Sequence, residues 1–147
     1  MLVIREMQEN EIKTLSALWL NASLKAHAFI KADFWRKNQS LIETKYLPQS
    51  LTYVYTEHNC LKGFLSLSDH KEVAGLFVAT SFQGQGIGSA LMNFVQKRYP
   101  SLTLDVYAKN ENAVRFYQKH NFRPIKTYIG DDTGAESIKM RWQKQCI

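Results

Sequence analysis

A glycine-rich connection between a strand and a helix constrains the fold of this chain more than any other feature. Residues 72–78 form a nearly continuous apolar run, which predicts a central strand covered on both faces. From Ile87 onward, apolar residues recur at offsets of three, four, seven and eight, which predicts an amphipathic helix. The connection Gln83-Gly-Gln-Gly-Ile-Gly-Ser89 therefore places its glycines where a buried strand leads into a helix.

This connection has the properties of an anion site. Glycine lets a ligand approach the backbone closely, and the first turn of a helix leaves N–H groups unpaired at the positive end of its dipole. A Walker loop is excluded because no lysine precedes the helix. A dinucleotide-binding fold would need Gly or Ala at Ser89. Asp105 lies near the distance expected of its ribose-binding acid, but the roughly forty residues that follow Asp105 are too few for the rest of such a sheet. A coenzyme A pyrophosphate loop and a tight turn without a ligand remain open.

A second motif, Asn-Glu-Asn-Ala-Val-Arg-Phe-Tyr, begins at Asn110. Asn110 can cap a helix, and Ala113 and Tyr117 then lie four residues apart on one face of it. Asn121 stands where this helix ends and can take the left-handed conformation that usually falls to glycine. Taken alone, the Phe-Tyr pair that closes the motif would be interpreted as core aromatics.

The remaining hydrophobic pattern predicts a mixed sheet. Asn10 is the expected N-cap of a first helix, and a second helix is expected over 32–46, ending before Pro48. The order β-α-α-β-β-β-α-β-α-β-β indicates an α/β sheet of mixed direction rather than a regular βαβα alternation. The expected strands cover residues 2–6, 51–56, 61–67, 72–78, 102–107, 122–129 and 136–142.

Length and charge limit the class of protein. A chain of 147 residues with 45% hydrophobic residues predicts one globular domain over 1–147. The 19 Lys and Arg residues against 13 Asp and Glu give a net charge of +6, which suits a nucleotide cofactor, an acidic protein or a nucleic acid. The cations are scattered along the chain, whereas a nucleic-acid-binding domain needs an unbroken basic face.

The cysteines and the chain start indicate a cytoplasmic protein without a metal. Cys60 and Cys146 are too few for a disulfide scaffold or a cysteine zinc site, so a buried thiol is expected at Cys60 and an incidental one at Cys146. Charge appears as early as Arg5, which leaves no room for a signal peptide. The longest uncharged run, 73–96, is interrupted by glycines and polar residues and does not predict a membrane span.

The two motifs together closely resemble those of the GCN5-related N-acetyltransferases (GNAT family). Gln-x-x-Gly-x-Gly at 83–88 is followed about twenty residues later by Asn-x-x-Ala-x-x-Phe-Tyr, and the element order matches across essentially the whole chain. The sequence looks like a small single-domain member of bacterial type. The resemblance implies about seven mostly antiparallel strands flanked by about four helices, with strands 72–78 and 102–107 splayed at the cofactor site.

The resemblance also implies acetyl-CoA as the acetyl donor. It implies that a strand pairs with the pantetheine of the coenzyme, that the glycine turn binds its pyrophosphate, and that a helix lies along its thioester arm. Two departures are Gln83 in place of a more frequent arginine and Asn121 in place of a more frequent glycine. The implied contacts are Leu76, Phe77, Val78, Gln83, Gly84, Gln85, Gly86, Ile87, Gly88, Ser89, Asn110, Ala113, Phe116 and Tyr117.

The implied chemistry is direct attack of a neutral amine on the thioester, with no acyl-enzyme. Tyr117 matches the tyrosine beside the cofactor sulfur and can donate a proton to the departing thiolate. Deprotonating a lysine amine of pKa ~10.4 at pH 7 costs about 4.6 kcal/mol, so a base is expected unless the enzyme selects the rare neutral amine. Glu72 is the candidate base because it begins the central strand, and its parity matches that of Ala74, Leu76 and Val78; a solvated strand-end carboxylate is the equal alternative.

The acceptor is expected against the two N-terminal helices. His27, Phe29 and Trp35 are the candidate substrate-binding residues, with ordinary core packing as the alternative. Arg115 and Lys119 could reach the phosphates of the coenzyme, with solvated surface as the alternative. The acceptor is either a protein lysine or a small amine, and a catalytically weak acetyl-CoA-binding regulatory module is the rival to an enzyme.

Overall fold

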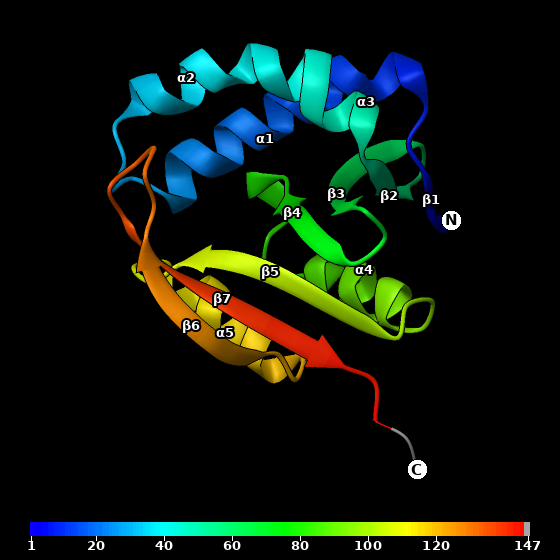
Figure 1. The fold of residues 1–147 in the computed structure, drawn as a ribbon. Helices are drawn as coiled ribbons and strands as arrows, with labels where there is room; N and C mark the ends of the chain where they lie inside the picture. Colours follow the sequence, from blue (N-terminus) through cyan, green and yellow to red (C-terminus); the bar gives the residue numbers. More distant parts are fainter. Residues whose placement is uncertain (146–147) are drawn as a thin grey trace.

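One seven-stranded sheet organises the protein in the computed structural model, which describes residues 1–145 (Figure 1). Its strand order is β1-β2-β3-β4-β5-β7-β6, and its pairs are antiparallel apart from the parallel pair of β4 and β5. The strands are β1 (Leu2–Glu6), β2 (Leu51–Glu57), β3 (Cys60–Ser68), β4 (Glu72–Val78), β5 (Ser101–Tyr107), β6 (Arg123–Ile129) and β7 (Glu136–Gln143).

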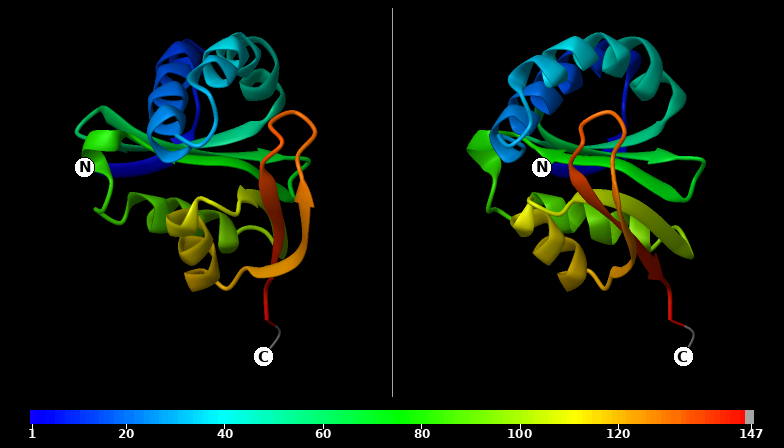
Figure 2. Two further views of the ribbon diagram at one scale, coloured as in Figure 1. Left: turned by 90° about the vertical axis from the view of Figure 1, so that its left-hand side faces the viewer. Right: turned by 60° about the vertical axis from the view of Figure 1, so that its left-hand side comes forward.

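Helices cover both faces of the sheet (Figure 2). One face carries α1 (Ile12–Ala26), α2 (Ala32–Leu41), the π-helical turn η2 (Ile42–Tyr46) and α3 (Leu47–Gln49). The other face carries α4 (Ile87–Gln96) and α5 (Glu111–Lys119), and the 3-10 turns are η1 (Glu9–Glu11) and η3 (Thr80–Phe82). The mixed, mostly antiparallel α/β fold predicted from the sequence is confirmed.

The sheet opens between β4 and β5. These strands are in register at the pair Glu72 and Thr103, where the N–H of Thr103 also donates to the carbonyl of Lys71 at 2.9 Å. Beyond Glu72 the two strands separate, which confirms the predicted splay. The expectation that residues 72–78 are covered on both faces is wrong, because this strand borders the opening: Val73 is buried, but Ala74 is exposed.

A β-bulge at Ala74 reverses the direction of the side chains along β4. The β3 partners of Glu72 and Gly75 lie two residues apart, so these two β4 residues face the same side although they are three apart in sequence. The prediction that Glu72 shares a face with Leu76 and Val78 is therefore wrong. The extra residue moves the carboxylate to the side of the sheet that α1 and α2 cover.

Two hydrophobic clusters fill the layers on either side of the sheet, and alternation along β3 connects them. Phe64 points toward α1 and α2, whereas Leu65 and Leu67 point toward α4. Each fully buried leucine stabilises the fold by about 2 kcal/mol relative to exposure. The largest side chains of the α1 cluster are Leu15, Trp19, Trp35, Leu47 and Phe64, and those of the α4 cluster include Leu91, Met92, Leu104, Phe122 and Met140.

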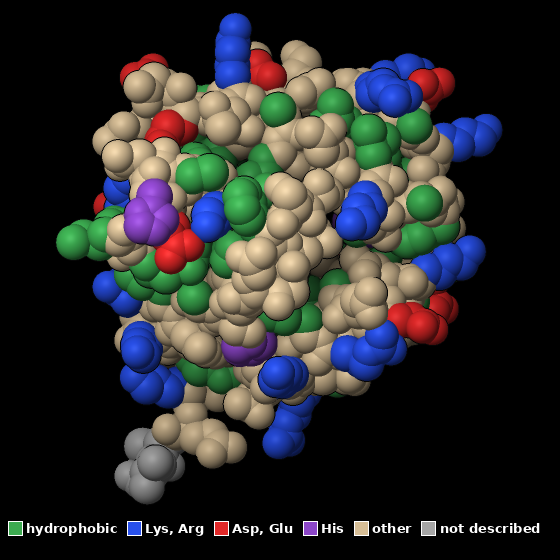
Figure 3. Space-filling view, turned by 180° about the vertical axis from the view of Figure 1, so that it is seen from behind, with side chains coloured by type: hydrophobic (Ala, Val, Ile, Leu, Met, Phe, Trp, Pro, Cys, Tyr) green, Lys and Arg blue, Asp and Glu red, His purple; other side chains and the backbone are tan. Residues whose placement is uncertain are grey.

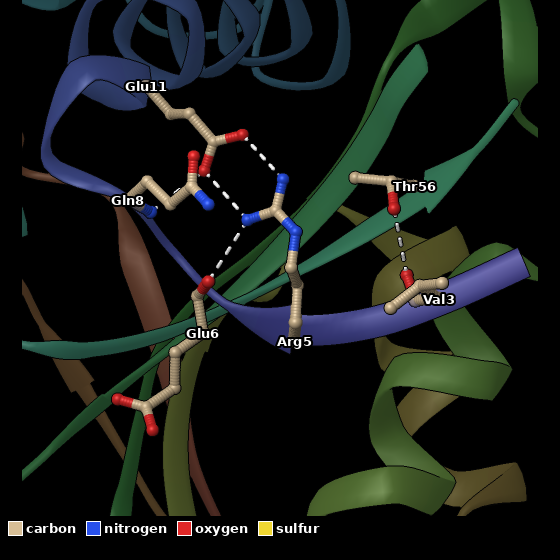
Figure 4. Close-up of polar contacts among 6 residues, drawn as sticks. All are labelled: Val3, Arg5, Glu6, Gln8, Glu11 and Thr56. Carbon is tan, nitrogen blue, oxygen red and sulfur yellow. Dashed lines mark hydrogen bonds and ion pairs between the residues drawn. The ribbon is translucent and has the colours of Figure 1, made fainter. Parts of the chain in front are cut away.

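The first helix begins differently from the prediction. The Glu11 carboxylate accepts from the backbone N–H of Gln8 at 2.8 Å in a capping box, and Glu11 itself is the N-cap of α1. The Arg5 guanidinium donates to both oxygens of the same carboxylate at 2.9 and 2.8 Å (Figure 4). Asn10 is not the cap: it lies inside the 3-10 turn η1, whose capping box joins Gln8 and Glu11, and α1 begins only after this turn.

The second helix continues past its predicted end. The π-turn η2 connects α2 to α3 without a break, and Pro48 lies in α3. Cys60 is exposed rather than buried, because it opens β3 directly after the hairpin turn, and Cys146 lies outside the described residues. Within residues 1–145, no helix has the length and apolarity needed to cross a membrane.

Candidate active site

The opening between β4 and β5 has two different sides (Figure 2). The glycine turn leaves the end of β4 on one side, and the hairpin between β6 and β7 rises toward α1 and α2 on the other. Tyr117 of α5 and residues of β4 and β5 line the same cavity between them. The second motif thus reaches the split of the sheet through Tyr117, whereas the glycine turn lies outside this cavity.

The glycine turn presents open backbone. Gly84 and Gly86 have φ angles of 80° and 83°, and a Cβ built at either position meets no atom within 4 Å. Gly86 is the left-handed N-cap of α4, and its carbonyl accepts from the N–H of Ala90 at 3.0 Å. The three N–H groups of the first turn, 87–89, precede that bond and have no helical acceptor. The turn thus offers backbone donors to an anion in open space.

The other side of the turn packs on α5. A Cβ at Gly88 would lie 3.4 Å from the Phe116 ring, an ordinary van der Waals distance, so the start of α4 packs directly against α5. The Gln83 amide donates to the carbonyl of Val78 at 3.2 Å and thereby closes the turn onto the end of β4. Ser89 Oγ lies 3.0 Å from Nε2 of His120, which stands at the end of α5.

The second motif forms α5 as predicted. Asn110 Oδ1 accepts from the N–H of Ala113 at 3.3 Å, and Asn121 is left-handed with a φ of 71°. The amide of Asn110 also donates to Nε2 of His27 at 3.1 Å, which links α5 to the end of α1. Burial raises the pKa of Tyr117 to about 12, so its hydroxyl stays protonated at neutral pH.

Two adjoining cavities lie on the side of α1 and α2. The inner cavity, of about 440 Å³, reaches Tyr117; the outer groove, of about 700 Å³, reaches Glu72. Both are lined by Trp19, Trp35, Ala74, Gly75, Phe77, Tyr107 and Asp132. The bulge in β4 is what brings Glu72 to this side.

Aromatic rings form the wall of the inner cavity. His27 stacks on Trp35 at 5.1 Å and meets the edge of Tyr107 at 5.0 Å. Burial lowers the pKa of His27 to about 4, so the ring is neutral at pH 7. Of the three predicted substrate-binding residues, His27 and Trp35 line this cavity. Phe29 is exposed and packs behind them, with its ring 5.5 Å from that of Tyr107.

Among residues 1–145, every charged side chain that lines the two cavities is acidic, although Lys139, which does not line them, lies 3.9 Å from Asp105. Lys and Arg are absent from the described residues that line them, although the whole chain carries +6. Sequence reasoning missed Asp131 and Asp132, for which the available signal was a pair of aspartates in a turn that ends in glycine at 134, and it considered Asp105 only for a dinucleotide-binding fold. The carboxylates that line the cavities are Asp69, Glu72, Asp105, Asp131 and Asp132.

Cations lie elsewhere on the surface. On the face opposite the β6–β7 hairpin, Lys and Arg side chains stand singly or in small groups around a centre of backbone and uncharged polar atoms (Figure 3). Arg115 is exposed and donates to Asn112 at 2.6 Å, and Lys119 is also exposed. The described chain contains no group of three His, Cys, Asp or Glu side chains placed to hold a metal ion.

Residues 6–144 match the family model described as an acetyltransferase (GNAT) domain. This chain belongs to the GNAT family. Two relatives in Escherichia coli K12 are named peptidyl-lysine N-acetyltransferases. YiaC is 38% identical over 140 residues, covering 95% of this chain and 96% of its own, and YjaB is 30% identical over 132 residues, covering 89% and 88%. The GNAT chain is accordingly an N-acetyltransferase, as the two motifs predicted.

Solved GNAT structures share the fold. The solution structure of apo YjaB from Escherichia coli superimposes with a TM-score of 0.84 at 26% identity, covering 96% of this chain and 97% of that one. The PaiA N-acetyltransferase of Thermoplasma acidophilum, solved in complex with coenzyme A, has a TM-score of 0.75 at 18% identity, covering 98% and 99%. The second likeness concerns the fold alone.

Proposed function

We propose that this GNAT enzyme, folded as one domain over residues 1–147, transfers an acetyl group from acetyl-CoA directly to the side-chain amine of a lysine in a polypeptide. The observation that carries the proposal is the cavity at the strand split. Tyr117 lies at its coenzyme side, whereas its acceptor side is lined by carboxylates and aromatic rings and by no Lys or Arg among the described residues. Such a lining suits an ammonium group.

The coenzyme side fits acetyl-CoA. The open backbone at Gly84 and Gly86 and the unpaired N–H groups of the first turn of α4 suit a diphosphate. Bound acetyl-CoA supplies the acetyl group in activated form as a thioester. The backbone of β4 beyond Glu72 has no β5 partner, which leaves it free to pair with an extended arm. The proposed contacts are Leu76, Phe77, Val78, Gln83, Gly84, Gln85, Gly86, Ile87, Gly88, Ser89, Asn110, Ala113, Phe116 and Tyr117.

Tyr117 is proposed as the general acid. Its raised pKa keeps the hydroxyl protonated at neutral pH, and it lines the cavity between the coenzyme and acceptor sides. A thiolate that leaves the acetyl group needs one proton, and Tyr117 is the titratable side chain of the second motif in this cavity. The second proton, which the attacking nitrogen loses as the amide forms, can return to the Tyr117 phenolate directly or through solvent.

Glu72 is proposed as the base that accepts the ammonium proton, directly or through water. Because of the bulge it faces the outer groove with Gly75 and Phe77, on the side where the amine enters. In Glu72→Gln we expect kcat/KM at pH 7 to fall about tenfold to a hundredfold. The loss should shrink as the pH rises toward the pKa of the free amine. A pH profile parallel to that of the parent enzyme would remove Glu72 from this role.

The size of the acceptor side favours a polypeptide over a small amine. The inner cavity, whose wall includes His27, Trp35 and Tyr107, has room for an aliphatic chain, and the adjoining outer groove gives room for the residues on either side of the lysine. The relatives' names, peptidyl-lysine N-acetyltransferases, point to the same class of acceptor. Asp132, which lines both cavities, is proposed to orient the ammonium.

A thiol-release assay tests the proposed function. Purified protein and acetyl-CoA are combined with a lysine peptide, the same peptide with arginine for lysine, free lysine and spermidine, and acetylation is located by mass spectrometry. We expect release with the lysine peptide, little with the small amines, and none with the arginine peptide. Preference for a small amine would reject the acceptor. Acetyl-CoA binding without release from any amine would favour a regulatory module, and absence of binding would reject the proposal altogether.

A further inference from the structure

His120 lies outside both motifs, yet it contacts the glycine turn. It is the C-cap of α5 and only 9% exposed. Its Nε2 lies 3.0 Å from Ser89 Oγ in the first turn of α4, and its carbonyl accepts from the amide of Gln96 at 3.0 Å. His120 therefore joins the end of one motif helix to the start of the other.

The ring of His120 is held in place by packing as well. Its centroid lies 4.6 Å from that of Phe116, the same ring that contacts Gly88. The Ser89 hydroxyl carries one proton, so it can donate to an anion in front of the turn only when it is not donating to Nε2 of His120, which is the case when Nε2–H is the donor. Nε2–H of His120 is placed to supply that bond to Ser89.

The charges around His120 are few. Burial lowers the pKa of His120, and the neighbouring Lys119 lowers it further, so the free protein holds a neutral ring at neutral pH. The contacting side chains from α4 are Ser89 and Gln96, and the ring that contacts it from α5 is Phe116; none of these is charged. A diphosphate bound at the start of α4 would place negative charge close to this ring and favour its protonation.

We propose that His120 is a positioning residue that directs the Ser89 hydroxyl toward the diphosphate of the coenzyme and makes coenzyme binding tighter as the pH falls. The inference rests on the proposed function, because it requires acetyl-CoA at the glycine turn. Proton uptake and coenzyme binding are linked: each makes the other more favourable. The donors of the proposed diphosphate site are mainly backbone amides. His120 adds one titratable group to that site.

Calorimetry from pH 7.5 to pH 6.0 tests the inference. The probe is dephospho-coenzyme A, because it lacks the phosphate monoester that itself titrates near pH 6. In the parent protein we expect the Kd to fall about fivefold over this interval, with proton uptake visible as a dependence of the heat on the buffer. In His120→Gln, which keeps an amide donor, the Kd at pH 7.5 should stay within about threefold and become independent of pH.

Two more variants separate positioning from packing. His120→Phe keeps a ring against Phe116 but removes the donor, so the Kd at pH 7.5 should rise roughly tenfold, the size of one hydrogen bond to an anion. Ser89→Ala should show the same rise, and the double variant should be no weaker than either. His70→Asn, at an exposed turn, is the matched control and should keep the parent slope.

The outcomes distinguish this inference from the proposed function. If the parent and His120→Gln share one pH slope, or if Ser89→Ala binds as tightly as the parent, the role of His120 is overturned while coenzyme binding stands. If no variant binds acetyl-CoA or the probe at any pH, the proposed function fails instead. If His120→Phe does not fold, His120→Gln and Ser89→Ala still decide the question.

Discussion

The two sides of the opened sheet are built from different materials. On the coenzyme side, backbone N–H groups of one short turn face open space, and the glycines at 84 and 86 hold their positions through local φ angles. On the acceptor side, side chains from α1, α2, β4, β5 and the β6–β7 hairpin converge on two cavities. A site made of contiguous backbone depends on local conformation, whereas a site made of distant side chains depends on the whole fold.

The largest effect is expected from a matched pair of glycine substitutions, one on each side of the opening. Gly86→Val should weaken acetyl-CoA binding roughly a thousandfold, because it forces a branched residue into a left-handed conformation and costs about two hydrogen bonds to the diphosphate. Gly134→Val carries similar strain in the β6–β7 hairpin, where φ is 69°, and should leave the coenzyme Kd within about threefold. Calorimetry measures both. Equal loss of coenzyme affinity in the two variants would contradict the separation of the sides.

Tyr117→Phe tests the point where the two sides meet. Loss of the phenol should lower kcat about a hundredfold and leave the acetyl-CoA Kd within a few-fold, because the ring packing against Phe116 and Phe122 is kept. Single-turnover thiol release and calorimetry give the two values. Unchanged turnover would remove this residue from the mechanism.

Asp132→Asn tests the acceptor side alone. The substitution removes the negative charge of the one carboxylate that lines both cavities among the described residues. We therefore expect kcat/KM for a lysine peptide to fall about tenfold, mostly through a higher KM. Coenzyme affinity should not change. Asp33→Asn removes the same charge from the first turn of α2, outside both cavities, and is the control. A rise in the coenzyme Kd, or an equal effect of both variants, would show that Asp132 does not act on the acceptor.

The smallest effect is expected far from both sides. Glu11→Gln loses the bidentate contact with Arg5 and should destabilise the fold by about 1 kcal/mol, or about 2–4 °C in Tm, with activity unchanged at 25 °C. Arg5 lowers the pKa of Glu11, so this contribution is present above the carboxylate's unfolded pKa and is lost as the pH falls through the folded one. The difference in Tm from the parent should therefore shrink as the pH falls below the usual range of a carboxylate, and Glu9→Gln is the control, with a Tm close to that of the parent at neutral pH.

The same contrast explains what the sequence could predict. The glycine turn, the Asn110 cap and the left-handed Asn121 were all predicted correctly, because each depends on a few neighbouring residues. The residues 131 and 132 could not be placed at the acceptor side, since only the pairing of β6 with β7 carries them there. The predictions for Cys60 and Asn10 were wrong for a related reason. A hairpin turn exposes Cys60, and a 3-10 turn placed before α1 takes up Asn10.

The bulge at Ala74 has a consequence for how chains of this type can diverge. Successive side chains of a strand point to opposite faces of the sheet. One additional residue therefore reverses the face of every side chain on one side of it. In a chain of this fold that lacked the extra residue, the carboxylate at the start of the strand would point to the face that α4 covers, and the proposed base would have to come from another element. A single insertion or deletion in β4 can thus move a side chain from one face of the sheet to the other without altering either motif.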